Sequence, residues 1–212
     1  MSAHVPAPPE TALSASKLRL LLAAEELFGT EGIAGVSLRQ ISRHAGNRNV
    51  SAAQYHFETK TGLMAAIMEY RRPQIDRYRE NLFNRRKLSF ETISAEQIID
   101  IINRGLFFQK DADGQRTFAR FLRALLLEDI FSKLWATAAI TAPFTDRLYE
   151  QLRQSVPAMP DRIWEFRRRQ LGLLGTVAIA DHANAQRNSG LSDEAFLSDL
   201  ARMISAGLKA PQ

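Results

Sequence analysis

Apolar residues in this chain recur at the spacing of a helix and nowhere alternate as a strand requires. Leu20, Ala24 and Phe28 fall at positions i, i+4 and i+8, on one face of a helix. No segment shows sustained alternation of apolar and polar positions, and the chain holds 29 Ala and 25 Leu but only 5 Val. We therefore predict an all-α fold, and 212 residues are enough to bury a sizeable core.

Proline, glycine and capping residues divide the chain into a tail and two helical regions. We expect residues 1–13, which hold three prolines, to form a disordered tail. Residues 14–62 and 63–212 are the two expected domains. Pro73 is expected to kink or break the helix that Thr59 caps. The helices are expected at residues 16–30, 37–45, 50–57, from 59 onward, and at 94–109, 115–132, 135–156, 160–188 and 193–208.

Positive charge is concentrated in the first part of the chain. The net charge is +5, and residues 1–87 contain 13 basic and 8 acidic side chains, whereas residues 88–212 contain 15 of each. Such asymmetry favours a polyanionic partner for the first part, because Lys and Arg contacts to phosphate supply most non-specific affinity for nucleic acid. A basic, well-solvated surface is the alternative on charge alone.

Several protein classes are excluded or disfavoured by what the sequence lacks. There is no cysteine, which excludes disulfides, Cys-based zinc sites and thiol catalysis. No apolar run reaches the roughly 20 residues of a bilayer span, and the first ten residues do not resemble a secretory signal, so we expect a cytoplasmic protein. Asp111 to Gly114 resembles a calcium loop only faintly. We expect no metal and no cofactor.

The segment from Ser37 to Leu63 has the organisation of a helix-turn-helix. Ser37 is a good N-cap, Gly46 permits a turn with positive φ, and a second short helix follows. Ile41 and Ala45 lie one turn apart and can pack on the neighbouring helices. This spacing alone leaves two interpretations open, a DNA-binding unit or an ordinary pair of core helices.

The sequence here resembles the TetR family of one-component transcriptional repressors. The resemblance runs from about Leu20 to Met68 and includes AAEELFGTEGIAGVSLRQISRHAG followed by YHFETKTGLMAAIM. Its most specific part is Tyr-His-Phe followed by x-x-Lys-x-x-Leu, which ends the family's recognition helix and starts its fourth helix. The turn NRNV is one residue longer than the commonest family pattern. The resemblance implies that residues 14–62 bind DNA and that residues 63–212 bind an effector and dimerise.

The same resemblance assigns roles to individual residues. The positions at the start of the second helix touch the DNA backbone and sometimes a base, those at the centre of the third helix read bases, and those at the third helix's end and the fourth helix's start contact phosphate. Each of these side chains has a plainer alternative as a solvated or packing residue, and Phe57 is expected in the core. The expected DNA-binding set is Ser37, Arg39, Arg48, Ser51, Ala52, Gln54, Tyr55, His56 and Lys60.

A basic run follows the helix-turn-helix between Arg71 and Lys87. It can extend a DNA footprint, but in the family the distal part of the fourth helix points away from DNA. We therefore expect these side chains to be solvated or paired within their own domain.

The last two expected helices are suited to pairing with a second copy of the chain. Leu171 to Ala180 is apolar nearly all round, and the last helix carries a narrower apolar stripe. Two such helices from each chain can form a four-helix bundle with twofold symmetry, although both can also be core of a monomer. The expected interface is Leu171, Gly172, Leu174, Gly175, Ala178, Phe196, Leu200 and Ile204.

Aromatic residues in the middle of the chain are expected to line an effector pocket. The expected lining is Phe107, Phe118, Phe121 and Trp135, with Phe108 and Phe131 nearby in sequence, and plain core packing is the alternative for each. Arg104, Arg120 and Arg123 can bind an anionic ligand or form salt bridges.

Two further interpretations stay open beside a ligand-responsive repressor. A small-molecule-binding helical enzyme is disfavoured because no nucleophile–base pair, paired carboxylates or phosphate-binding glycine loop is evident. A DNA-binding dimer without an effector is the other. The sequence does not name the effector or the operator, nor does it distinguish repression from activation.

Overall fold

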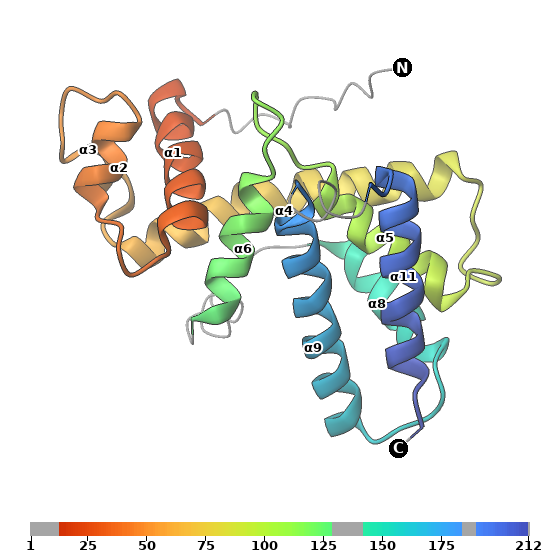
Figure 1. Ribbon diagram of the computed structural model, residues 1–212. Coiled ribbons are helices and arrows are strands. Elements are labelled where there is room, and N and C mark those ends of the chain that lie inside the picture. Colours follow the sequence, from red (N-terminus) through yellow and green to blue (C-terminus); the bar gives the residue numbers. More distant parts are fainter. Residues whose placement is uncertain (1–12, 129–141, 184–189, 212) are drawn as a thin grey trace.

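The computed structural model describes residues 13–128, 142–183 and 190–211, and every regular element within them is an α-helix. The all-α prediction is therefore confirmed. Figure 1 shows α1, α2 and α3 at one end of the molecule, the long α4 running lengthwise, α6 beside α1 in the middle, and the remaining helices at the other end. The helices are α1 Ala15–Glu31, α2 Leu38–His44, α3 Ala52–Phe57, α4 Lys60–Arg85, α5 Ala95–Phe107, α6 Thr117–Leu127, α8 Pro143–Gln154, α9 Asp161–Ala180 and α11 Asp193–Lys209.

Local signals in the sequence account for most helix ends near the N-terminus. Ser37 Oγ accepts a hydrogen bond from the Gln40 amide, and the Ser37 amide donates to Gln40 Oε1, so α2 begins with a capping box. Thr59 caps α4 through the amide of Gly62 at 2.9 Å. Gly46 turns the chain after α2 with φ of +69°.

Of the two expected effects of Pro73, a kink or a break, the break is wrong, because α4 continues through it to Arg85. A proline in a helix interior removes one backbone donor and crowds the preceding turn. The side chain of Gln74 donates to the carbonyl oxygen of Tyr70 at 2.9 Å in that turn. Packing on both sides holds the helix, since Arg71, Ile75 and Asp76 are all buried.

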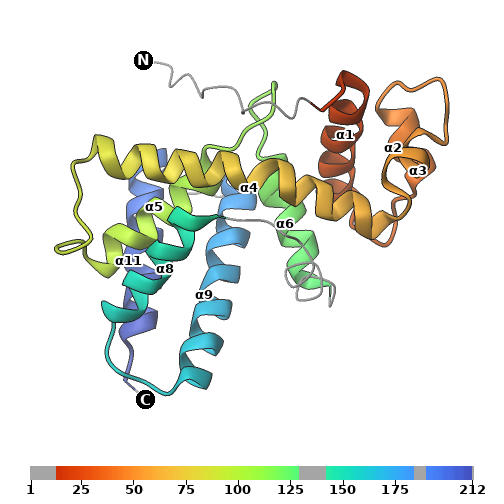
Figure 2. The same cartoon turned by 180° about the vertical axis from the view of Figure 1, so that it is seen from behind.

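The helices after α4 enclose the main core, and α5 lies at its centre. Seen from behind in Figure 2, α5 and α8 lie against α4, with α9 and α11 beyond them. The largest fully buried side chains include Phe28, Phe107, Phe118 and Phe121. Some helices are shorter than expected: α6 ends at Leu127, α8 begins at Pro143 and α9 ends at Ala180.

None of the helices in the described ranges has an apolar stretch long enough to cross a bilayer.

Candidate functional site

Helices α2 and α3 are fixed to each other by a buried serine that the sequence analysis did not single out. Ser42 is fully buried, donates to the Leu38 carbonyl at 3.0 Å and accepts from the Ala53 amide at 2.9 Å. Ile41 and Ala53 are also fully buried beside it. This contact across the turn determines which face of α3 is turned inward.

The turn between α2 and α3 is attached to α1. Asn47 Oδ1 accepts a hydrogen bond from Ser16 Oγ at 3.1 Å, and Asn49 Oδ1 accepts from the Ser51 amide at 2.9 Å. The two asparagines of the long turn NRNV therefore stabilise it in different ways: Asn47 attaches it to α1, and Asn49 accepts a bond from the residue that follows the turn. Only the tertiary contact to α1 shows the role of Asn47.

The outward face of α2 and α3 carries the polar and aromatic residues of the expected set. Tyr55 is 81% exposed, which is unusual for so large an aromatic side chain, and Gln54 and Arg48 are exposed beside it in sequence. The Gln54 amide is folded back onto the Glu58 carbonyl. Ser37, Arg39 and Ser51 are exposed as well.

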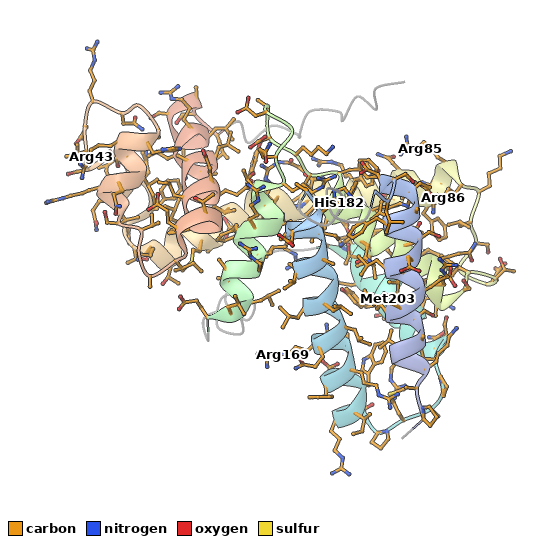
Figure 3. The ribbon with its side chains drawn as sticks, viewed as in Figure 1. Arg43, Arg85, Arg86, Arg169, His182 and Met203 are labelled. Carbon is orange, nitrogen blue, oxygen red and sulfur yellow. The ribbon has the colours of Figure 1, made fainter. Side chains whose placement is uncertain are left out.

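Arg43 belongs to this end of the molecule although it is absent from the expected set. It is exposed in the last turn of α2, and Figure 3 shows it at the outer end formed by α2 and α3. Its spacing could have indicated this, because Arg43 lies one helical turn after Arg39 on the same helix.

Ala52 does not fit the base-reading role expected for it. It is 8% exposed and belongs to the core cluster with Ala53 and Phe57. The bond between Ser42 and Ala53 turns this part of α3 inward, so the methyl group of Ala52 faces protein. The expectation that Phe57 lies in the core is confirmed, at 7% exposed.

His56 and Lys60 are half-buried at the junction of α3 and α4. The ring of His56 packs edge-on against Tyr55, with centroids 5.2 Å apart. Lys60 Nζ donates to the carbonyl oxygen of Ile33 at 2.9 Å, which ties the start of α4 to the loop after α1. Gly62 is needed here because a Cβ would lie 2.5 Å from the Phe57 carbonyl oxygen.

Much of the basic run after Arg71 is occupied within the chain. Arg71 pairs with buried Glu25 at 2.7 Å, Arg79 donates to Thr145, and Arg86 pairs with Asp100 at 2.6 Å. Figure 3 places Arg86, with neighbouring Arg85, at the end of α4 opposite to the helix-turn-helix.

Comparison with known proteins matches the helix-turn-helix segment. Residues 20–67 fit the family model of bacterial regulatory proteins, tetR family, from within α1 into the first turns of α4. Residues 20–67 are a DNA-binding segment of the TetR family of transcriptional regulators. Among curated protein sequences none matches this chain.

Two crystal structures assigned to TetR-family transcriptional regulators resemble the chain. One, from Rhodococcus sp., is 17% identical and has a TM-score of 0.48, covering 92% of this chain and 100% of that one. The other, from Rhodococcus sp. RHA1, is 19% identical with a TM-score of 0.45, covering 92% and 95%. The family assignment rests on the segment 20–67.

The chain has a large cavity among the helices that follow its TetR-type segment. Its volume is about 1200 Å³, and it is lined from α4, α5, α6, α8 and α9. Met68 and Ile75 of α4, Phe118 and Leu122 of α6, and Trp164 of α9 give it an apolar wall.

The expected aromatic lining of this cavity is largely wrong. Only Phe118 of that set lines it, and Trp135 lies outside the described residues. Phe107 is fully buried against Phe196 and His182, and Phe121 against Phe28. These rings are core because α1, α6 and α11 close over them.

Polar groups on the cavity wall were missed by the sequence analysis. Arg79, Asn103 and Tyr149 line it, as do several charged side chains of α8 and α9. By contrast, Arg104 lies outside it and pairs with Asp100 at 2.8 Å and Glu194 at 2.6 Å. Arg120 and Arg123 instead line a smaller hollow beside Gly29.

The residues expected at a dimer interface divide into two groups. Leu200, Ile204 and Gly175 are already buried within the chain, and a Cβ on Gly175 would lie 3.0 Å from Asn103 Oδ1 and 3.3 Å from Ile204 Cδ1. Gly172 is exposed and Leu174 is 40% exposed. Leu171, Ala178 and Phe196 are half-buried.

Further exposed apolar side chains lie on α9 and α11. Phe166 is 62% exposed and Val177 36%, and both share the face of Leu174 at helical spacing. Met203 on α11 is 54% exposed, and Figure 3 shows it between the two helices on the uncovered side.

No group of three or more His, Asp or Glu that could hold a metal ion occurs within the residues that the structure describes.

Proposed function

We propose that this chain is a homodimeric TetR-family repressor that binds a palindromic operator through α2 and α3, and that a small molecule in the cavity releases it. The observation that carries the proposal is the exposed face formed by Arg48, Gln54 and Tyr55 on two short helices braced from behind by Ser42. A transcriptional regulator acts on chromosomal DNA, so we propose the cytoplasm as its location.

Groups of this kind suit the two tasks of a DNA interface. The Gln54 amide can pair bidentately with an adenine edge once it leaves the Glu58 carbonyl. Arg39, Arg43 and Arg48 supply positive charge for phosphates, and Ser37, Ser51, Tyr55 and His56 supply hydrogen-bonding groups. Lys60 has three N–H donors, and its bonds to the carbonyl oxygens of Ile33 and Ala34 leave one of them for a phosphate.

Helix α6 is the element that can pass a change in the cavity to the DNA-binding segment. Leu122 of α6 lines the cavity, while Thr117 at its start donates to Glu25 of α1 at 2.5 Å. Glu25 also accepts two hydrogen bonds from Arg71 of α4 at 2.7 and 2.8 Å. A ligand that moves α6 therefore acts on α1 and α4 together, and needs only unequal affinity for the two arrangements.

The cavity distinguishes this proposal from a DNA-binding dimer without an effector. Ligand sites typically measure about 300–1000 Å³, and a cavity of about 1200 Å³ at the junction of five helices is at least as large. A protein that used these helices only to dimerise would have no use for a pocket of this size.

Selection of bound duplexes from a random pool, followed by fluorescence anisotropy on the selected sequence, tests the DNA-binding part. We expect Arg48→Ala to weaken binding and to reduce the slope of log affinity against log salt by about 1. The matched control is Arg85→Ala, which removes an exposed cation from the opposite end of α4 and should leave affinity and slope unchanged. Equal effects of the two variants would contradict the assigned face.

A further inference from the structure

The cavity is lined by a group of apolar side chains and a group of polar ones, here called its apolar wall and its polar end. Phe118, Leu122 and Trp164 contribute to the apolar wall, whereas Arg79 of α4 and Asn103 of α5 contribute to the polar end. An occupant must therefore combine an apolar body with at least one polar group.

Arg79 is a half-buried cation without a carboxylate partner among the described residues. Its Nη1 donates to Thr145 Oγ1 and its Nη2 to the Ile102 carbonyl, both at 2.9 Å, and its Nε has no partner there. Asp76 is reached only through Thr145, whose hydroxyl donates to Asp76 Oδ1 at 2.6 Å. Burial lowers the pKa of Arg79, because it disfavours the charged guanidinium. A buried charge that lacks an opposite charge is costly, and an anion beside it removes part of that cost.

Asn103 is a second unpartnered donor on the same cavity. The residue is 6% exposed, it lines the cavity, and its Nδ2 has no hydrogen-bond partner among the described residues. Gly175 of α9 leaves room for the amide, since a Cβ there would lie 3.0 Å from Asn103 Oδ1. A buried N–H without an acceptor is costly, and an acceptor group on a ligand would recover part of that cost.

The remaining charges on the cavity wall favour the same sign of ligand. The lining includes five arginines but only three carboxylates, so the wall is positive on balance. Arg168 pairs with Glu165 at 2.5 Å, and Arg169 is exposed on the side of α9 away from α11 (Figure 3). A cationic ligand would meet this excess positive charge and would offer nothing to Arg79.

We infer that the cavity binds an organic anion with an apolar body, its carboxylate or sulfonate against Arg79 and Asn103 and its body against Phe118, Leu122 and Trp164. This inference rests on the proposed role of the cavity as the effector site, and names the chemical class of the effector.

Two fluorescent probes that share an aromatic body test the inference on the full-length protein. These are 8-anilinonaphthalene-1-sulfonate, which carries a sulfonate, and N-phenyl-1-naphthylamine, which is neutral. We expect the sulfonate probe to bind roughly tenfold more tightly, as a charged hydrogen bond implies. Calorimetry with three ligands that share a ten-carbon chain should show the same preference, with decanoate binding more tightly than decanol and decyltrimethylammonium binding most weakly. Equal or tighter binding of the neutral or cationic members would overturn the inference.

Variants then locate the anion within the cavity. Arg79→Met should abolish the preference for the sulfonate probe, and Asn103→Asp should lower it by roughly tenfold because it places a carboxylate at the polar end. Asn103→Leu removes only the amide and provides a second variant where Arg79→Met fails to fold. Arg85→Met is the matched control on the same helix and should keep the preference. A preference that survives both Asn103→Asp and Arg79→Met would place the anion elsewhere and refute the assignment.

A separate readout distinguishes failure of this inference from failure of the proposed function. Anisotropy of an operator duplex is recorded with and without decanoate. If the anion preference holds but decanoate leaves DNA affinity unchanged, the ligand class stands and the role of the cavity in release is refuted.

Discussion

His182 shows at the scale of one residue how burial can make stability depend on pH. It is 2% exposed, and its ring lies edge-on to Phe107 at 4.9 Å and to Phe196 at 4.5 Å between centroids. Its Nε2 is 3.3 Å from Asp193 Oδ1, but neither ring nitrogen has a hydrogen-bond partner among the described residues. Burial lowers the pKa of His182, and nearby Arg116 lowers it further. The folded protein therefore keeps this imidazole neutral.

We expect the free energy of unfolding to decrease as the pH falls below about 6.5, because the unfolded chain then takes up a proton that folded His182 refuses. His182→Phe should fit among the surrounding rings and remove this part of the pH dependence. Urea unfolding at pH 7.5 and 5.5 measures it, and His44→Gln, at an exposed histidine, is the control. The same loss in His182→Phe and in the wild type would contradict the prediction.

The residues of the DNA-binding face were only partly predictable from the sequence. Tyr55 and Gln54 are exposed as expected, because a motif fixes the end of the recognition helix. Ala52 was wrongly expected on that face, since the rotation of a six-residue helix depends on tertiary contacts such as the bond between Ser42 and Ala53. The polar end of the cavity was not predicted for the same reason, because Arg79 and Asn103 come from different helices and only the tertiary structure places both on the cavity wall.

At the scale of elements, the closest packing between the DNA-binding segment and the rest is the contact of α1 with α6. A Cβ on Gly29 would lie 2.8 Å from Arg120 Cβ and 3.1 Å from the Phe121 amide nitrogen. Phe28 packs against Phe121 beside it, with ring centroids 6.0 Å apart. Because backbone stands opposite Gly29, a methyl group there can be accommodated only if the helices separate.

Gly29→Ala should therefore destabilise the protein by about 1–3 kcal/mol, as overpacking does, despite the higher helix propensity of alanine. It should also weaken the effect of any cavity ligand on DNA affinity. Gly35→Ala, at an exposed turn where a Cβ meets one carbonyl oxygen at 3.3 Å, is expected to change stability by less than about 0.5 kcal/mol. Thermal and urea unfolding of both variants check this, and equal destabilisation would refute it.

The ends of helices could be predicted where a capping or turn residue fixes them, but not where tertiary packing determines how far a helix continues. The caps at Ser37 and Thr59 and the turn at Gly46 were expected from residue type and are present. Pro73 was expected to kink or break its helix, but α4 continues through it, with its neighbours Arg71 and Ile75 buried. A rule about one residue cannot anticipate what packs against its helix.

At the scale of the whole molecule, α4 joins two ends that face different partners. The helix-turn-helix lies at one end, and α9 and α11 leave a side uncovered at the other, in front in Figure 1 and behind α8 and α5 in Figure 2. The exposed fractions of Phe166, Leu174, Val177 and Met203 range from 36% to 62%, so this side is apolar. Such a surface is costly to leave in water, and a twofold partner would cover it with the same helices.

Dimerisation is expected to be necessary for tight operator binding, because two recognition helices must reach half-sites about 34–36 Å apart. Light scattering should give about twice 23.9 kDa for the wild type. Val177→Glu combined with Met203→Glu should yield a monomer and lower operator affinity by about 100-fold, because each half-site then binds alone. Leu127→Glu, at a 74% exposed leucine on α6, is the control and should remain dimeric. A double variant that stays dimeric would show that the copies meet through another surface, and a monomeric one with full affinity would remove the need for two half-sites.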